Sequence, residues 1–465
     1  MYENEEKLTK AFVIAAIVWG VVGMCMGLMA ALQLYLPQLN FANEYINFGK
    51  IRPLHTNAII FGLVCNFIIG LSLYIVAKTS VVNLVSKGLS WFLFWGWQIT
   101  LVIGLISIAL GYTSTKEYAE FEWPIDIAIV VLWLTFGYIF FGTLAKRKTK
   151  HIFVSNWFSG GVIIVIGLIY LINNLAIPVY AFKGYSIFSG ASDALVQWWW
   201  GHNAVGFLLT AGFVGTNYYF IPKLVNRPIY SYRLSLITFW GLIGFYTWAG
   251  THHLLFTSVP SWIQNIGVVM SILLWIPSWA GAFNAWMTCT SNKEELKTNP
   301  VVWFFLSSIA YYALATFEGP LMAIRWFNMI AHNTSWVIGH VHSGALGWVG
   351  MTCIATFYYF IPKLYKKELY SYGLVKVHFV LAHIGVLFYI VSLWIGGIGQ
   401  GVKSLSLTES GSLTYSFVDI LRFMEPYMLG RAIGGALFIL GMLVMVYNLI
   451  MTVKKPQKVV IEGAY

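Results

Sequence analysis

The sequence has 465 residues, of which 59% are hydrophobic and only 10% are charged, and its mean hydropathy is +0.73. A soluble protein of this length needs far more charged side chains to cover its surface, so the composition excludes a soluble protein and indicates an integral membrane protein. The net charge of +11 does not indicate nucleic-acid binding, because no basic patch with interleaved aromatic residues is present.

Long, nearly uncharged segments recur along the whole chain at the length needed to cross a hydrocarbon core about 30 Å thick. The alternating pattern of a membrane β-barrel is missing, so these segments are predicted to be helices. The prediction is an all-α integral membrane protein with a single transmembrane domain over residues 1–465. Its crossing segments, about twelve in number, are 11–36, 53–77, 89–112, 124–145, 152–176, 192–221, 231–255, 262–289, 301–327, 336–363, 373–397 and 428–453.

The positive charges indicate how the chain is oriented in the bilayer. The N-terminus, the alternate loops on its side and the C-terminus hold 20 of the 28 Lys and Arg residues, and the opposite side holds 8. Because cytoplasmic loops carry the excess of Lys and Arg, both termini are predicted to be cytoplasmic. The N-terminal "MYENEEKLTK" is acidic and mixed, unlike a cleaved signal peptide, so the first helix is expected to be retained.

One stretch of the sequence occurs twice. "TNYYFIPKLVNRPIYSYRL" at 216–234 returns as "TFYYFIPKLYKKELYSYGL" at 356–374, displaced by 140 residues, and the same displacement places His202 on His342. The segment 53–77 also opens with a histidine, His55. We therefore predict a four-helix unit used three times, with an inward-facing histidine in the second helix of each unit.

The histidines gather at one depth of the predicted bundle. Buried polar groups are costly inside a membrane, so six of them at one level in four helices indicate a functional site. Within "GHVHSGALGW", residues i and i+2 of a helix point about 200° apart, so His340 and His342 serve different sites. His202, His252 and His253 remain as a three-imidazole set that suits copper or zinc. The six are His55, His202, His252, His253, His340 and His342.

The motifs around these histidines resemble those of the haem-copper oxygen reductases, and most closely those of the cbb3-type cytochrome c oxidases. They are "WWWGHNAVGFLLTAGF", "FYTWAGTHHLL", "FEGP" and "IGHVHSGALGWVGM", and the resemblance covers essentially the whole chain. It implies the subunit I fold in a bacterial inner membrane, with His55 and His342 on a low-spin haem b. It also implies His340 on a high-spin haem b3, with the facing copper held by His202, His252 and His253.

The resemblance also implies a redox-active phenol. A better-known branch of these enzymes places Glu and Tyr after its first copper histidine, but here the run is "GHNAVG". In the cbb3-type branch a tyrosine from the next helix, here Tyr246, is cross-linked to the copper ligand that corresponds to His202. A nitric oxide reductase, with non-haem iron in place of copper, is the alternative, and Tyr246 and the missing glutamate argue against it.

A polar stripe on the 231–255 segment predicts how protons reach this phenol. Tyr232, Ser235 and Tyr246 lie within about 60° of one another around a helix, and the 14 residues from Tyr232 to Tyr246 span roughly 21 Å. The stripe matches the single proton channel implied by the resemblance. An ordinary hydrogen-bonding helix face is the alternative interpretation of Ser235.

Further charged and imidazole side chains are expected at the outer edge of the bundle. Arg52, Arg325 and Arg431 can pair with haem propionates, since guanidinium matches carboxylate in a bidentate fork. The resemblance places His332 near the propionates and Glu117 at a calcium ion. Glu318 in "TFEGP" is an intramembrane carboxylate and is expected near the copper site or a proton path, whereas packing or surface roles are expected for His378 and His383.

The predicted function is a terminal respiratory oxidase that reduces O2 to water with electrons from cytochrome c, coupled to proton uptake and pumping. The sequence contains no C-x-x-C-H motif for attaching a c-type haem. We therefore expect membrane-anchored c-type cytochrome subunits as partners, with soluble or membrane cytochrome c as donor. A transporter with histidine proton relays and a non-catalytic scaffold are the alternatives of other classes.

Overall fold

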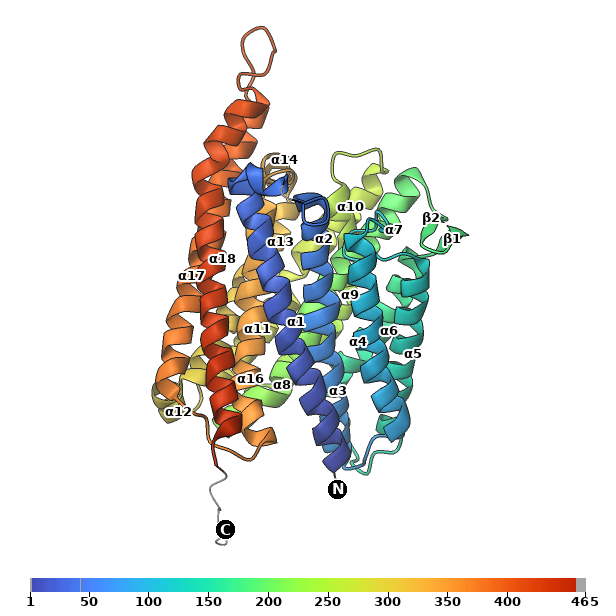
Figure 1. The fold of residues 1–465 in the computed structure, drawn as a ribbon, viewed down its shortest axis with the longest axis vertical. Helices are drawn as coiled ribbons and strands as arrows, with labels where there is room; N and C mark the ends of the chain where they lie inside the picture. Colours follow the sequence, from blue (N-terminus) through green and yellow to red (C-terminus); the bar gives the residue numbers. More distant parts are fainter. Residues whose placement is uncertain (1, 42, 457–465) are drawn as a thin grey trace.

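The computed structural model describes residues 2–41 and 43–456, which form a bundle of long helices with both ends of the chain near one end of the bundle (Figure 1). Eleven helices in this part of the chain are long and apolar enough to cross a membrane. The other expected segment corresponds to α9 (Tyr232–Ala249), which has 18 residues and includes Arg233 and several hydroxyl side chains. The predicted all-α membrane architecture is confirmed.

The first four-helix unit follows the predicted segments closely. Its second crossing helix is continuous from Phe48 to Ser80, with a π-helical stretch between two α-helical ones. The elements of this unit are α1 (Glu3–Tyr35), the 3-10 turn η1 (Pro37–Asn40), α2 (Phe48–Asn57), the π-helical η2 (Ala58–Val64), α3 (Cys65–Ser80), α4 (Lys87–Ala109) and α5 (Trp123–Ala145).

The second unit departs from the predicted segments in three places. The 152–176 helix ends at Asn173 and an antiparallel β-hairpin follows it. The 231–255 helix gives way to a 3-10 turn. The 262–289 segment is one crossing span, Ser261–Cys289, with a local irregularity at Leu274, because the ring of Pro277 clashes with the carbonyl four residues earlier. The elements are α6 (Val154–Asn173), β1 (Ala176–Tyr180), β2 (Lys183–Ser186), α7 (Gly190–Asn203), π-helical η3 (Ala204–Ala211), α8 (Gly212–Val225), α9 (Tyr232–Ala249), 3-10 η4 (Gly250–Leu254), α10 (Ser261–Leu273) and α11 (Trp275–Cys289).

The third unit ends in two helices that are longer than predicted. At about 1.5 Å per residue, the 38 residues of α18 span roughly 57 Å, and Figure 1 shows α17 and α18 rising together beyond the other helices. The elements are α12 (Lys293–Thr298), α13 (Pro300–Ala323), α14 (Arg325–Ala331), α15 (Ser335–His342), π-helical η5 (Ser343–Gly350), α16 (Met351–Leu364), α17 (Tyr372–Leu405) and α18 (Phe417–Lys454).

The backbone supports a threefold repeat. In each unit the third helix begins with a serine N-cap whose hydroxyl accepts a hydrogen bond from the backbone N–H three residues later. The three caps have nearly the same backbone angles, with φ of −150°, −145° and −150° and ψ of 117°, 118° and 119°. They are Ser86, Ser231 and Ser371.

The second helix of each unit lies at the centre of the bundle and contains a π-helical stretch. The most apolar windows of these three helices are 89%, 78% and 78% buried, whereas the other crossing helices reach 56% at most. The stretches η2, η3 and η5 each begin within three residues of a predicted ligand, His55, His202 or His342. π-helical turns are rare and concentrate at functional sites, so each copy of the repeat has a backbone feature typical of such a site beside its histidine.

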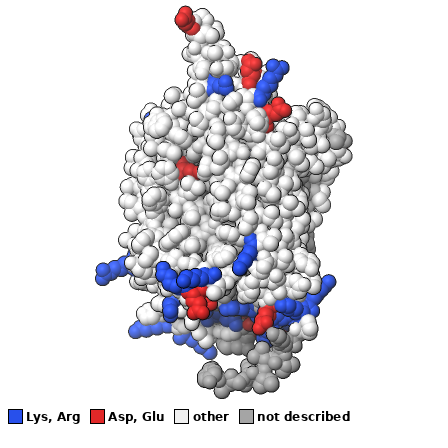
Figure 2. All heavy atoms as spheres, turned by 90° about the vertical axis from the view of Figure 1, so that its left-hand side faces the viewer, with Lys and Arg blue, Asp and Glu red and all other residues white. Residues whose placement is uncertain are grey.

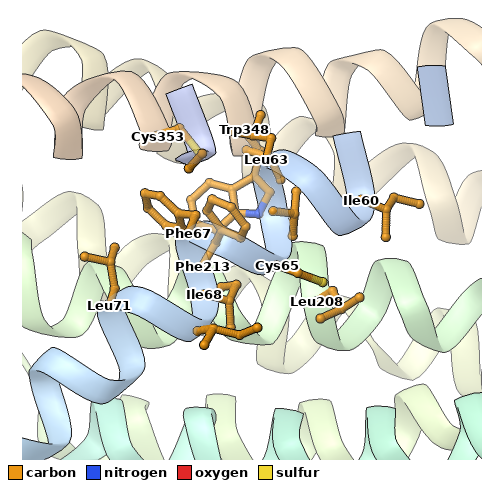
Figure 3. Close-up of a cluster of buried hydrophobic side chains, with 14 of the residues drawn as sticks. Ile60, Leu63, Cys65, Phe67, Ile68, Leu71, Leu208, Phe213, Trp348 and Cys353 are labelled. Atoms are coloured by element: carbon orange, nitrogen blue, oxygen red, sulfur yellow. The ribbon is translucent and has the colours of Figure 1, made fainter. Parts of the chain in front are cut away.

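Tryptophan side chains satisfy backbone carbonyls of the π-helical stretches. Trp97 donates to the carbonyl of Phe61 in η2 at 2.8 Å, and Trp348 donates to that of Leu209 in η3 at 2.8 Å. Inside a bilayer such groups have no water to bond, so the indoles remove a substantial penalty. Figure 3 shows Trp348 where the three central helices meet, beside Phe67 and Phe213, whose rings stack 4.9 Å apart.

Charged side chains lie at the two ends of the bundle. On the face drawn in Figure 2, Lys and Arg gather near the end that carries the chain termini, and an almost uncharged belt separates them from a few charges at the other end. A belt of this kind is what a bilayer core requires. The chain is a multi-pass membrane protein.

Glycines allow α17 and α18 to pack backbone against backbone. A Cβ on Gly434 would lie 2.6 Å from the carbonyl oxygen of Gly385 and 2.6 Å from the amide of Tyr389. A Cβ on the neighbouring Gly435 would meet only Leu28, at an ordinary 3.7 Å. Close backbone approach through small residues is a common way to pair membrane helices.

Replacement of Gly434 by Ala is expected to force α17 and α18 apart at the cost of overpacking, about 1–3 kcal/mol. The apparent thermal unfolding midpoint of the detergent-solubilised protein should fall. Gly435→Ala is the matched control and should leave the midpoint within error. Equal midpoints for the two variants would show that the contact does not hold the helix pair together.

Candidate functional site

His55 and His342 face each other from α2 and α15. Their imidazole rings are parallel within 3°, with centroids 6.5 Å apart. His55 Nδ1 lies 2.7 Å from the carbonyl oxygen of Gly23, and His342 Nδ1 lies 2.8 Å from that of Ile338. Both Nδ1 atoms therefore carry hydrogen, which leaves the two Nε2 atoms as metal donors. With metal–nitrogen bonds of about 2 Å, this ring separation fits one iron between the two histidines.

Two further side chains border this pair. Tyr389 of α17 places its hydroxyl 3.2 Å from His342 Nε2 and accepts a hydrogen bond from Arg431 Nε of α18 at 2.9 Å. Gly27 of α1 leaves room for the imidazole of His55, because a Cβ there would lie 2.6 Å from its Cε1. Arg431 was predicted from sequence, whereas Tyr389 and Gly27 were not.

His340 leaves α15 on the other side and contacts a carboxylate. Its Nδ1 lies 2.9 Å from Glu318 Oε2 of α13, and Ser343 donates its hydroxyl to the same oxygen. A carboxylate behind an imidazole fixes the ring orientation and makes Nε2 the metal donor. The structure therefore places Glu318, left open between two roles by the sequence, directly behind the predicted ligand of the high-spin haem.

The three-imidazole set comes together from α7 and η4. Ligand atoms of His202, His252 and His253 all lie within 4.8 Å of one another. Residues 2–41 and 43–456 contain no other group of three or more His, Cys, Asp or Glu side chains that could hold a metal ion. The ring of His253 stacks on Trp198 with centroids 3.9 Å apart. Three neutral imidazoles with an open position suit a catalytic copper.

Hydrogen bonds determine which nitrogens of this set are free. Ser271 donates its hydroxyl to the carbonyl of Gly267 at 2.6 Å, so its oxygen must accept from His252 Nδ1, 2.6 Å away. His252 therefore presents Nε2 as a metal donor. His202 Nδ1 is buried with no hydrogen-bond partner among the described residues, as expected of a donor atom reserved for a metal.

Tyr246 packs against His202. Their ring centroids are 5.3 Å apart, and the phenol hydroxyl faces Thr210 of η3. This approach requires glycine at 206, because a Cβ there would lie 2.4 Å from the tyrosine ring. The phenol therefore lies beside the imidazole set, where the sequence predicted it.

A column of polar side chains leads from the inner half of the bundle toward Tyr246. The amide nitrogen of Asn284 of α11 donates to the carbonyl of Ser231 at 2.9 Å. Its other hydrogen is shared between the hydroxyl oxygens of Ser235 and Tyr218, which lie 3.1 and 3.2 Å away. Tyr312 of α13 lines the same pocket as Tyr218 and Asn284, and its buried hydroxyl has no hydrogen-bond partner among the described residues. We call Ser235, Asn284, Tyr218, Tyr312 and Tyr246 the polar column.

The column differs from the stripe predicted on one helix. Tyr232 is 59% exposed and packs on Trp157, with ring centroids 5.9 Å apart, on the side of α9 that faces α6. Ser235 instead faces α11. The sequence could not identify Asn284, Tyr218 and Tyr312, because these residues come from three other helices.

The outer loop 110–122 joins the bundle through charged groups. Arg52 and Glu117 form an ion pair at 3.3 Å. Asn57, two residues after His55, donates to the buried Glu120 at 2.7 Å. Burial raises the pKa of Glu120 to about 7, against the lowering effects of Asn57 and Arg52, so this carboxyl gains a proton near neutral pH.

The remaining predicted residues lie at varied distances from the imidazole set. His332 is near it, with its ring centroid 6.2 Å from that of His253, whereas Arg325 donates to Asn265 at 2.8 Å. His378 is fully buried and bonds to Tyr358 at 3.0 Å, which excludes a surface role. His383 bonds to Ser307 at 3.1 Å.

Comparison with known proteins identifies the family. A family model described as "Cytochrome C and Quinol oxidase polypeptide I" matches residues 7–437. The chain is 50% identical to the cbb3-type cytochrome c oxidase subunit CcoN1 of Stutzerimonas stutzeri over 449 residues, 96% of this chain and 95% of that protein. It is 45% identical to cytochrome c oxidase subunit 1 of Rhodobacter capsulatus over 462 residues, 98% and 87% of the two chains.

A solved structure shares the fold. The cryo-EM structure of a heme-copper terminal oxidase dimer aligns with a TM-score of 0.78, covering 98% of this chain and 85% of that chain at 17% identity. None of the relatives reported above is a nitric oxide reductase, so the alternative finds no support. The chain belongs to the family of cytochrome c and quinol oxidase polypeptide I, and within this haem-copper family it is an oxidoreductase subunit of the cbb3-type cytochrome c oxidases.

Proposed function

We propose that this chain carries the complete O2-reducing site of a cbb3-type oxidase. The observation that carries the proposal is the placement of donor atoms on both sides of α15. His340 contacts Glu318 on one side, and His342 pairs with His55 on the other. The imidazoles of His202, His252 and His253 form a separate set.

The donor atoms support a separate role for each flank. His55 and His342 would hold a low-spin haem b, since imidazole is a common ligand of haem iron and their rings face each other. His340 would hold a high-spin haem b3 by one imidazole, and the three-imidazole set would hold copper. The bound haems and copper supply electron transfer and O2 binding.

Tyr246 would supply an electron and a proton from its hydroxyl when the O–O bond breaks. Its contact with His202 supports the ring-to-ring cross-link implied by the family resemblance. Gly206 would serve by letting the phenol approach the imidazole. Tyr246 of α9 and His202 of α7 would then act together.

The polar column would return protons to Tyr246 from the cytoplasmic side. Hydroxyl oxygens accept one proton while releasing another, so Ser235, Tyr218 and Tyr312 can relay without a net change of charge. Asn284 would hold Ser235 and Tyr218 in line, because its amide nitrogen lies within hydrogen-bonding distance of both hydroxyls. Tyr232 would lie outside this path, because it packs on Trp157 on the side of α9 that faces α6.

The outer edge would hold the haem propionates. Arg52, Arg431 and His332 come from different helices near the two haem sites and can pair with carboxylates. A calcium ion at Glu117 remains a prediction, supported by one hard carboxylate oxygen at this edge. Because Glu117 also pairs with Arg52, the ion and the arginine would share it.

The orientation and partners follow from charge and from the missing c-type haem motif. The end rich in Lys and Arg, which carries both termini, would face the cytoplasm of a bacterial inner membrane (Figures 1 and 2). Electrons would arrive on the opposite side from membrane-anchored c-type cytochrome subunits, supplied by soluble or membrane cytochrome c. Pumped protons would leave on that side.

The purified complex is expected to contain about one copper for two non-covalent haems, as the donor set requires. Metal analysis together with O2 uptake on reduced cytochrome c tests this expectation. Non-haem iron in place of copper, with NO consumed faster than O2, would contradict the proposal and support a nitric oxide reductase instead.

Replacement of His340 by Ala is expected to lower O2 turnover by more than about a hundredfold, since a metal ligand matters more than its hydrogen-bonding partner. The low-spin absorbance should remain, because His55 and His342 are untouched. His342→Ala is the control and should lose that absorbance. Loss of both haem signals in His340→Ala would contradict separate flanks.

Replacement of Tyr246 by Phe removes one oxygen atom and should reduce turnover roughly 10²–10⁴-fold while both haem spectra persist. Tyr219→Phe is the matched control, because Tyr219 contacts Tyr74 and Phe220 outside the polar column. Steady-state O2 uptake at equal haem content is the measurement. An active Tyr246→Phe enzyme would refute the phenol's role.

A further inference from the structure

A pocket lies beside the polar column in the inner half of the bundle. It is formed by α8, α11, α13 and η5, and it has room for at least one water molecule. Tyr218, Asn284 and Tyr312 line it together with Asn217. The pocket therefore adjoins three members of the polar column, Tyr218, Asn284 and Tyr312.

Asn217 is the residue of this pocket with two polar side-chain atoms that have no partner among the described residues. Its side chain is 4% exposed, and neither its amide nitrogen nor its amide oxygen has a hydrogen-bond partner among the described residues. Val214, Tyr218 and Ile221 line the pocket from the same face of α8, which directs Asn217 into it. A buried amide without partners is costly, so such a group calls for a specific partner.

The internal repeat shows that α8 does not need this amide for its fold. In the copy at 356–374 the corresponding residue is Phe357, which is 1% exposed and packs on Phe67 with ring centroids 5.8 Å apart. Both copies keep the following tyrosine and the serine N-cap, and in both an asparagine donates to the carbonyl of that serine: Asn284 to Ser231 and Asn448 to Ser371. The amide therefore occurs where the polar column passes and is replaced by an apolar ring where it does not.

We propose that Asn217 holds water in this pocket and thereby connects the Tyr218 end of the polar column to Tyr312 and Tyr246. The water accepts one hydrogen bond from the amide nitrogen and donates one to the amide oxygen. Each proton that enters the water from the Tyr218 side is matched by one that leaves toward Tyr312, and the amide does not change its charge. The inference rests on the proposed delivery of protons to Tyr246, and Asn217 acts in it as a positioning residue.

Asn217→Leu keeps the volume and removes the polar atoms. We expect turnover about tenfold lower, equivalent to the loss of roughly one hydrogen bond, and a larger slowing on transfer from H2O to D2O than in the wild type. Haem spectra and copper content should stay unchanged. Asn217→Ser, which keeps a polar group and leaves space for another water, should recover most of the turnover.

Thr216→Val is the matched control, because the neighbouring Thr216 is equally buried but donates to the carbonyl of Gly212 in its own helix. A high-resolution cryo-EM map of the unaltered oxidase complex gives a readout that depends on no variant. It should show ordered water within hydrogen-bonding distance of both amide atoms of Asn217.

Wild-type turnover and an unaltered D2O effect in Asn217→Leu would overturn the inference, as would a map with no water at the amide. These outcomes are distinct from failure of the proposed function itself. That failure would appear as missing copper or as an active Tyr246→Phe enzyme, whatever the behaviour of Asn217.

Discussion

His340 and His342 leave α15 in opposite directions because two residues of a helix turn through about 200°. This constraint separates the two flanks of the site and decides what each flank must supply. On one side His342 needs only a second imidazole, which His55 provides. On the other side His340 needs a carboxylate behind it and a metal set in front, which Glu318 and the imidazoles of η4 provide.

The clustering of the histidines and the repeated unit could be predicted from the sequence, because both depend on residue type and on spacing along the chain. The role of Tyr246 came from the family resemblance and remains a prediction. Glu318 was visible as an intramembrane carboxylate, but its contact with His340 depends on how α13 packs beside α15. The same holds for Ser271 behind His252 and for Asn284 in the polar column. Hydrogen-bond partners are chosen by the register between helices, and no periodicity within one segment contains that register. The longer α17 and α18 were missed for another reason: beyond the bilayer a helix needs packing rather than unbroken hydrophobicity.

The repeats show how one scaffold carries different chemistry. Asn284 and Asn448 brace Ser231 and Ser371 with the same pair of hydrogen bonds in the second and third copies. Above the brace the copies differ. Tyr218 lines a pocket together with Asn217 and Asn284 in one copy, whereas Tyr358 bonds to the buried His378 in the other. The brace maintains the fold, and the positions around it were free to specialise.

The π-helical stretches occur at nearly the same place in all three copies of the repeat, which bears on how the chain evolved. Such a turn amounts to one extra residue in an α-helix, and it persists only where its local benefit outweighs its cost. All three second helices contain one directly after a predicted ligand. A single insertion in an ancestral four-helix unit, copied with that unit, accounts for all three more simply than separate events.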